Sequence, residues 1–127
     1  MRYIVKAVLR KNKHHLLKKA IEDGKLGTGS VAGGEYIRDM MHARLLDDGI
    51  AEWIEVCFCD PPLDEERPYW EEYFELKEIT DATDRHNCKH ETGKLPWSCV
   101  SCNCTKKQEA ELMKKGKSFY ESLLPSS

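Results

Sequence analysis

The sequence predicts an α+β protein in which two helices cover a small, mainly antiparallel sheet with a ferredoxin-like flavour. Three observations predict this class. Residues 2–10 alternate in polarity as a strand does, residues 13–48 repeat apolar side chains at helical spacing, and residues 51–59 alternate again. A Cys/His-rich stretch at 84–105 follows neither period, and we expect it to be a metal-binding knuckle appended to the fold.

The chain has 127 residues, of which 33% are charged and 40% are hydrophobic, as in ordinary globular proteins. This length suits one domain with one modest core. We expect an α+β core at 1–80, a Cys/His knuckle at 81–104 and a C-terminal helix at 105–127 that packs on the core.

The N-terminus and the apolar runs bear on location. No apolar run approaches the ~20 residues that span a bilayer. The first ten residues are interrupted by Lys6 and carry no small-residue cleavage site, so they do not form a secretory signal. We therefore expect a cytoplasmic protein with no membrane association.

The first half of the chain predicts a strand and two helices. The strand at 2–10 precedes a helix at about 13–23, which Asn12 would cap and Gly24 would end. A second helix at about 35–48 would present an apolar stripe to the core, made of Tyr36, Ile37, Met40, Met41 and Leu45.

A glycine-rich connection, residues 24–34, joins the two predicted helices. Backbone amides of such a loop before a helix can bind an anion. The loop follows a helix rather than a strand and matches neither established phosphate-binding pattern, so a simple change of chain direction is the favoured interpretation.

The middle of the chain predicts two further strands. In the strand at 51–59, Trp53, Glu55, Cys57 and Cys59 share one face. Residues 69–79 fit either a strand or a helix, and their aromatic content favours a third strand paired with the second. After the knuckle, apolar residues at helical spacing predict one final helix at about 105–124.

The knuckle places five potential metal ligands within seventeen residues. Cys88 and His90 are separated by eight residues from the run Cys99, Cys102 and Cys104. A C-x-x-C turn lets two thiolates face one ion from a tight loop. A reducing cytosol disfavours the alternative that the six cysteines of the chain form disulfides.

Two tetrahedral ligand sets fit this spacing, and both contain Cys88, Cys99 and Cys102. Cys104 is the favoured fourth ligand, and His90 is the alternative. Cys57 and Cys59 could lend a ligand from the second strand, although buried cysteines usually act as small hydrophobic side chains. Over about twenty residues this stretch resembles zinc knuckles and ribbons in general.

Zinc is the expected metal because it prefers tetrahedral thiolate and imidazole ligands. An iron–sulfur cluster is the alternative, although the C-x-C spacing suits a cubane less well. A catalytic zinc site would need an open position and a nearby carboxylate, and no complete H-x-E…P-C-x-x-C pattern occurs because Ser98 precedes Cys99. We expect no catalytic residues and a structural metal. An iron–sulfur electron-transfer protein or a metal-dependent enzyme subunit is the alternative function.

The charge distribution bears on partners. Residues 47–84 hold fourteen acids and two bases, and residues 85–118 hold eight bases and three acids, while the whole chain has a net charge of −2. A nucleic-acid surface normally needs a net basic domain, so nucleic-acid binding is not expected. We expect an accessory or interaction protein that joins an oligomer or a protein partner through its aromatic residues Trp53, Tyr69, Trp70 and Trp97.

Overall fold

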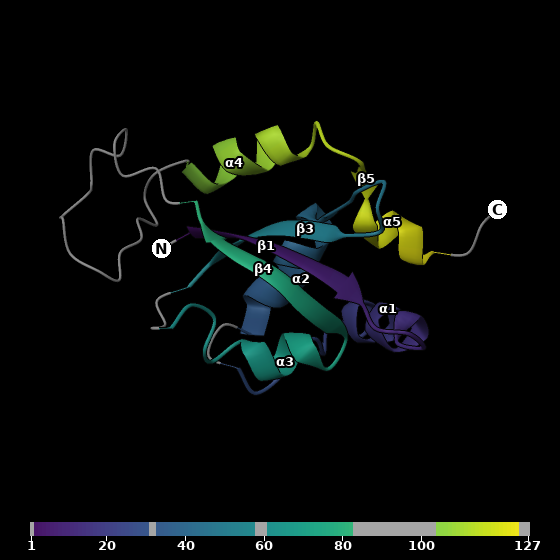
Figure 1. Ribbon diagram of the computed structural model, residues 1–127. Coiled ribbons are helices and arrows are strands. Elements are labelled where there is room, and N and C mark those ends of the chain that lie inside the picture. The colour runs from purple at the N-terminus through teal and green to yellow at the C-terminus, as the bar shows by residue number, and fades with distance from the viewer. Residues whose placement is uncertain (1, 31–32, 58–60, 83–103, 125–127) are drawn as a thin grey trace.

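A computed structural model describes residues 2–30, 33–57, 61–82 and 104–124. These residues form an α+β fold in which five antiparallel strands make one open sheet in the order β4-β1-β3-β2-β5, accompanied by five helices (Figure 1). In chain order the elements are β1 (Arg2–Leu9), α1 (His14–Glu22), α2 (Gly33–His42), β2 (Arg44–Leu45), β3 (Ala51–Val56), α3 (Arg67–Glu71), β4 (Phe74–Asp81), α4 (Cys104–Leu112), β5 (Lys117–Ser118) and α5 (Phe119–Leu123).

The sheet lies between two layers of helix. Helices α1, α2 and α3 lie on one face, and α4 lies across the other (Figure 1). The pairing of β1 with β3 sets Val5 opposite Trp53 and Ile4 opposite Ile54. Because successive strand residues face opposite sides, Val5 and Trp53 point into the main core, whereas Ile4 and Ile54 lie beneath α4.

Aromatic rings fill the main core. The ring centroids of Trp53 and Trp70 lie 4.6 Å apart, those of Tyr36 and Trp70 4.9 Å apart, and those of Phe74 and Phe119 5.6 Å apart. The expectation that Trp53 and Trp70 are exposed interface residues is therefore wrong, since both are fully buried. Tyr69 is half-buried against the same cluster, and Trp97 lies outside the described residues.

The first helix agrees with the sequence analysis in extent but differs at its start. Helix α1 covers His14–Glu22, and its N-cap is Lys13, with no capping side chain. Asn12 instead adopts a φ of +69°, so the predicted cap is wrong. Within this helix Leu17 is fully buried, whereas Leu16 is 53% exposed.

The second helix is shorter than predicted. Helix α2 ends at His42, and Arg44–Leu45 form strand β2, which pairs with Glu52 and Ala51 of β3. The apolar spacing of residues 35–48 is compatible with a continuous helix. Arg44 and Leu45 instead pair with β3, and the backbone hydrogen bonds of that pairing favour a strand. Met41, expected to be buried, is 48% exposed on α2.

The stretch 69–79 fitted either a strand or a helix by sequence, and the structure contains one of each. Arg67–Glu71 form the short helix α3, with Pro68 in its first turn, and Phe74–Asp81 form strand β4. This strand pairs with β1 and not with β3, so the predicted partner is wrong. The interposed α3 carries the chain across the sheet to the other side of β1.

The predicted final helix is interrupted. Helix α4 ends at Leu112, the two-residue strand β5 pairs with β2, and α5 follows. Gly116 lies in this break with a φ of +50°, and a Cβ there would approach the Leu45 carbonyl oxygen to 2.2 Å. The close backbone contact that attaches β5 to β2 thus requires a glycine. None of the described helices is both long and apolar enough to cross a membrane.

Candidate functional site

The predicted metal ligands lie mainly beyond the part of the chain that the structure describes. This applies to Cys59, Cys88, His90, Cys99 and Cys102. Cys104 is the first residue of α4, so the favoured fourth ligand opens a helix. Cys57, just after β3, lies in the main core, on the opposite side of the sheet from α4.

The two ends of the Cys/His-rich stretch are held together. The backbone N–H of Ala82, at the end of β4, donates to the Arg2 carbonyl over 2.8 Å. The Gln108 side chain, one turn into α4, donates through Nε2 to the Ala82 carbonyl. Residue 82 and the start of α4 therefore meet at the same end of the sheet (Figure 1).

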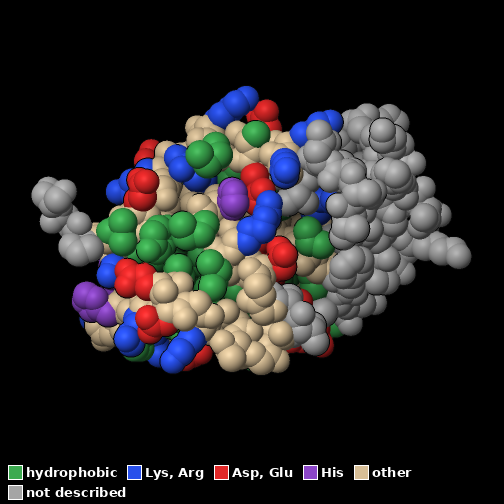
Figure 2. Space-filling model, turned by 180° about the vertical axis from the view of Figure 1, so that it is seen from behind, with side chains coloured by type: hydrophobic (Ala, Val, Ile, Leu, Met, Phe, Trp, Pro, Cys, Tyr) green, Lys and Arg blue, Asp and Glu red, His purple; other side chains and the backbone are tan. Residues whose placement is uncertain are grey.

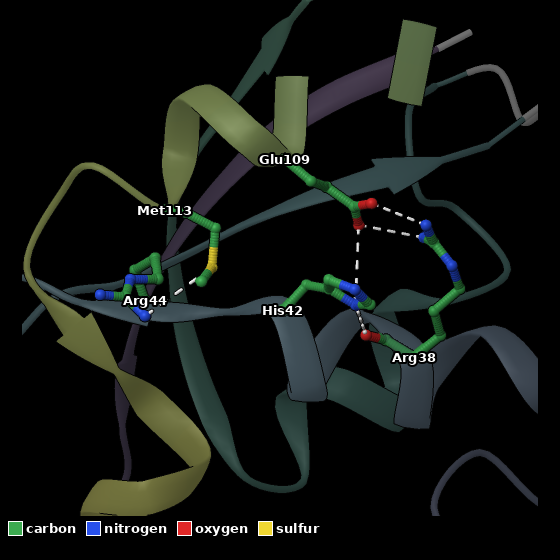
Figure 3. Close-up of polar contacts among 5 residues, drawn as sticks. All are labelled: Arg38, His42, Arg44, Glu109 and Met113. Carbon is green, nitrogen blue, oxygen red and sulfur yellow. Dashed lines mark hydrogen bonds and ion pairs between the residues drawn. The ribbon is translucent and has the colours of Figure 1, made fainter. Parts of the chain in front are cut away.

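A buried ion pair holds α4 against the rest of the fold. Glu109 of α4 is 5% exposed, and both of its carboxylate oxygens accept hydrogen bonds from the Arg38 guanidinium of α2, at 2.6 and 3.0 Å (Figure 3). His42 Nδ1 lies 3.9 Å from Glu109 and 2.9 Å from the Arg38 carbonyl. Since a carbonyl only accepts, the Nδ1 of His42 is the donor of this hydrogen bond. Two-point pairing of this kind fixes direction as well as position.

The chain after α4 is also attached. Arg44 of β2 donates through Nε to the Lys115 carbonyl at 2.8 Å and through Nη2 to the Gly116 carbonyl at 3.1 Å. Lys115 in turn places its ammonium 3.4 Å from the buried Glu52 carboxylate of β3. Helix α4 is thus bonded to the fold at its middle, through Gln108 and Glu109, and after its end.

A second group of polar side chains lies within the main core. Glu55 of β3 is 3% exposed and accepts hydrogen bonds from the indole N–H groups of Trp53, at 2.9 Å, and Trp70, at 3.1 Å. Burial raises the pKa of Glu55 to about 8, even though both indoles favour its charged form. Its carboxyl group therefore carries a proton at neutral pH.

Two further acids and a thiol lie near Glu55. Burial, followed by the charge of Glu55, raises the pKa of Asp39 on α2 well above its usual range. The Cys57 thiol donates to the buried carboxylate of Glu66 over 3.3 Å. Cys57 is therefore a hydrogen-bonded core residue, which agrees with its expected role as a small buried side chain.

Neither group of polar side chains forms a metal centre. Among residues 2–30, 33–57, 61–82 and 104–124, no group of three or more His, Cys, Asp or Glu side chains is arranged to hold a metal ion. The acids around Glu55 can store protons in the core. The contacts of α4 position the helix that Cys104 begins.

The glycine-rich loop has a structural explanation. A Cβ on Gly27 would lie 2.3 Å from the Tyr36 ring, so this glycine lets the ring pack against the backbone. Ser30 donates to the Glu65 carboxylate over 2.8 Å. A carboxylate beside the loop opposes the binding of an anion there.

Part of this arrangement was accessible from the sequence. The alternation of β3 places Glu55 on the same face as Trp53, which signals a carboxyl group in an aromatic core. The pairing of Arg38 with Glu109 joins residues far apart in the chain, and no local pattern predicts it. Searches against protein-family models, curated proteins and solved structures found no match for this chain.

Proposed function

We propose that this chain is a small zinc-binding accessory or interaction protein whose metal ion is structural. The observation that carries the proposal is the ligand spacing Cys88, Cys99, Cys102 and Cys104, with His90 as an alternative ligand. The hydrogen bond from Gln108 to the Ala82 carbonyl supports this proposal. It shows that the Cys/His-rich stretch leaves the fold and returns to it at neighbouring points.

A zinc ion in this stretch would fix the start of α4. Cys104 is both a proposed ligand and the first residue of α4, so metal coordination would fix the point at which the helix begins. The described contacts of α4 are largely polar, and Leu112 is its main buried apolar side chain. A helix with so little apolar burial gains from a fixed start.

The strand order supports the ferredoxin-like part of the proposal. Read as β1, helix, β2, β3, α3 and β4, the chain follows the β-α-β-β-α-β sequence of that architecture, with the spatial order β4-β1-β3-β2. Two helices, α1 and α2, lie between β1 and β2, where that architecture has one. Because this architecture hosts many unrelated activities, it adds nothing to the functional argument.

Exposed apolar side chains support a role in assembly. Leu16, Met41 and Leu124 are large, exposed and spread over α1, α2 and the end of α5. Figure 2 shows apolar side chains gathered on the back of the molecule, on the side where the C-terminus lies. These residues replace the buried Trp53 and Trp70 as the proposed contact with a second copy or another subunit.

Ligand substitution tests the proposed zinc site. Cys99→Ser and Cys102→Ser should each abolish stoichiometric zinc binding and lower the melting temperature, because structural zinc contributes ~10 kcal/mol or more to folding of small modules. Cys57→Ala is the control, and it should retain zinc even if the lost thiol lowers stability. Full metal content and unchanged melting in both knuckle variants would refute the assignment.

A further inference from the structure

Strand β4 forms one edge of the sheet, and among the described residues it pairs with β1 alone (Figure 1). Two backbone hydrogen bonds close this pairing at its ends, from Ala82 to Arg2 and from Arg10 to Tyr73. Residues of an antiparallel strand direct their backbone groups alternately towards and away from the partner. Counted from either end, the backbone groups of Leu76 and Ile79 therefore face the open edge. An open edge of this kind can accept a further strand.

A groove of about 370 Å³ lies beside this edge, between β4 and the segment that leads into α3. Leu76 and Ile79 line it from the strand, and Pro61 and Pro62 line it from the segment. Both strand residues belong to the core face of the sheet, yet their side chains are only half-buried. An added strand would direct every second side chain towards this apolar wall.

Both cations that line the groove already have acidic partners. The Lys77 ammonium lies 2.8 Å from the Glu75 carboxylate, and the Arg67 guanidinium lies 3.8 Å from that of Glu71. Neither cation is therefore left to attract an anionic ligand.

The remaining charge around this edge is negative. Residues 71–81 hold five acids and one base. Glu72 and Glu78 are exposed and make no ion pair with any of the described residues. Because complementary charge steers association and disfavours wrong partners, the edge favours a segment that carries Lys or Arg.

Strand β1 shows which pattern β4 accepts on its other side. The register sets Val5 opposite Ile79 on the core face and Lys6 opposite Glu78 on the outer face. Arg2 lies on the same face as Lys6, so apolar and basic side chains occupy opposite faces of β1. A partner segment of this pattern would place apolar side chains in the groove and basic side chains beside Glu78.

A bulge in β4 argues against a second copy of the chain as the added strand. Lys6 pairs with Glu78 and Ala7 pairs with Leu76, so Lys77 is an extra residue in β4. A bulge bends the edge and hinders the pairing of two rigid edges, whereas a short extended segment can follow the bend. Two copies would also bring two acidic edges together.

We propose that the open edge of β4 binds an extended basic segment of a partner protein as an additional antiparallel strand. The segment pairs with the backbone groups of Leu76 and Ile79. Its alternate apolar side chains enter the groove beside Pro61 and Pro62, and its Lys or Arg side chains lie near Glu78. This surface is separate from the proposed zinc site and does not depend on it.

Fluorescence anisotropy of a labelled peptide, titrated with the full-length protein, tests the proposal. The probe has the sequence of residues 2–10, whose alternation β4 already accepts from β1. The comparison peptide has glutamate in place of its three bases. We expect the basic peptide to bind at least about tenfold more tightly than the acidic one. No measurable binding, or equal binding of the two peptides, would overturn the proposal.

Two methylated forms of the basic peptide test the backbone pairing. In the proposed pairing the N–H groups of its Val5 and Ala7 face β4, and those of its Lys6 and Val8 face solvent. Methylation of the first two nitrogens should abolish binding, and methylation of the second two should leave affinity unchanged. Loss of binding with both forms would show that the peptide displaces β1, and retention with both would show that no strand pairing occurs. Either result would contradict the site.

Two exposed glutamates supply a matched pair of protein variants. Glu78→Lys should weaken binding of the basic peptide by about tenfold, because it reverses the charge beside the added strand. Glu121→Lys makes the same change on α5, outside the groove lining, and should leave affinity unchanged. The amide resonances of Leu76 and Ile79 should shift on binding. Equal affinity of the two variants, or shifts confined to other strands, would place the peptide elsewhere and refute the assignment.

Discussion

The Glu55 carboxyl group is protonated at neutral pH because its surroundings disfavour a charge. It is buried beneath α2, near the raised-pKa carboxyl of Asp39 and the carboxylates of Glu66 and Glu35. Two indole N–H groups lower its pKa, but burial outweighs them and holds the pKa at about 8. The core therefore tolerates this acid in its neutral form.

This ionisation predicts how stability changes with pH. An unfolded Glu loses its proton near pH 4.5, whereas folded Glu55 keeps it to about pH 8. Its contribution to the free energy of unfolding is therefore greatest below pH 4.5 and declines as pH rises towards 8. Asp39, whose pKa is also raised, contributes with the same sign.

Denaturant unfolding of wild-type protein and Glu55→Gln between pH 5 and pH 9 measures this effect. The variant should be less stable at pH 5, because an amide NH₂ cannot accept from an indole, and its stability should decline less steeply up to pH 8. Glu72→Gln, at an exposed residue, should keep the wild-type slope. An identical slope in wild-type protein and Glu55→Gln would show that Glu55 titrates normally.

At the scale of elements, α4 is held mainly by polar contacts, and Glu109 makes the strongest of them. Glu109→Gln should lower the free energy of unfolding by about 1–2 kcal/mol, because it removes a two-point, charge-assisted contact whose Arg38 side is partly exposed. Hydrogen exchange should accelerate in α4 more than in β1.

Glu111→Gln is the matched control on the same helix. Glu111 is exposed and pairs only with exposed Lys114 among the described residues, so its loss should cost less than about 0.5 kcal/mol. Equal destabilisation by Glu109→Gln and Glu111→Gln would show that the ion pair with Arg38 does not secure the helix.

Local sequence patterns predicted elements where local forces decide the structure. The strand at 2–10 and the helix at 13–23 are confirmed as β1 and α1 within one or two residues at each end. Apart from the Asn12 cap, the main errors lie in strand pairing, which the local pattern does not determine. Arg44–Leu45 leave the helical pattern to pair with β3, and β4 pairs with β1, because nothing local distinguishes one strand partner from another.

The candidate site divides in the same way. Spacing alone predicts the Cys/His ligands, since a metal site of this kind is largely encoded in a short stretch. The contact of Gln108 with Ala82 and the Arg38–Glu109 pair arise from tertiary packing. They join residues far apart in the chain, and no local pattern predicts such contacts.

At the scale of the whole molecule, the exposed apolar surface predicts self-association or assembly. Met41→Glu should shift the protein towards the monomer, because it places a charge on one of the exposed apolar side chains proposed as the contact. Met113→Glu alters an equally exposed methionine on α4 and should have little effect. Sedimentation velocity at several concentrations measures both.

Sedimentation velocity with and without added RNA or DNA separates assembly from nucleic-acid binding. The bases Lys106 and Lys107 share α4 with Glu109 and Glu111, so any binding to RNA or DNA should be weak and should fall steeply with added salt. Micromolar nucleic-acid binding at physiological salt by a protein that stays monomeric would overturn the proposed role in assembly.

The metal content of the purified protein tests the central claim most directly. Elemental analysis of protein purified without oxygen, combined with an assay for acid-labile sulfide, should find one zinc per chain and no sulfide. This result would agree with a tetrahedral site formed by Cys88, Cys99 and Cys102 with Cys104 or His90. Near-stoichiometric iron with sulfide would contradict the structural zinc and indicate electron transfer instead.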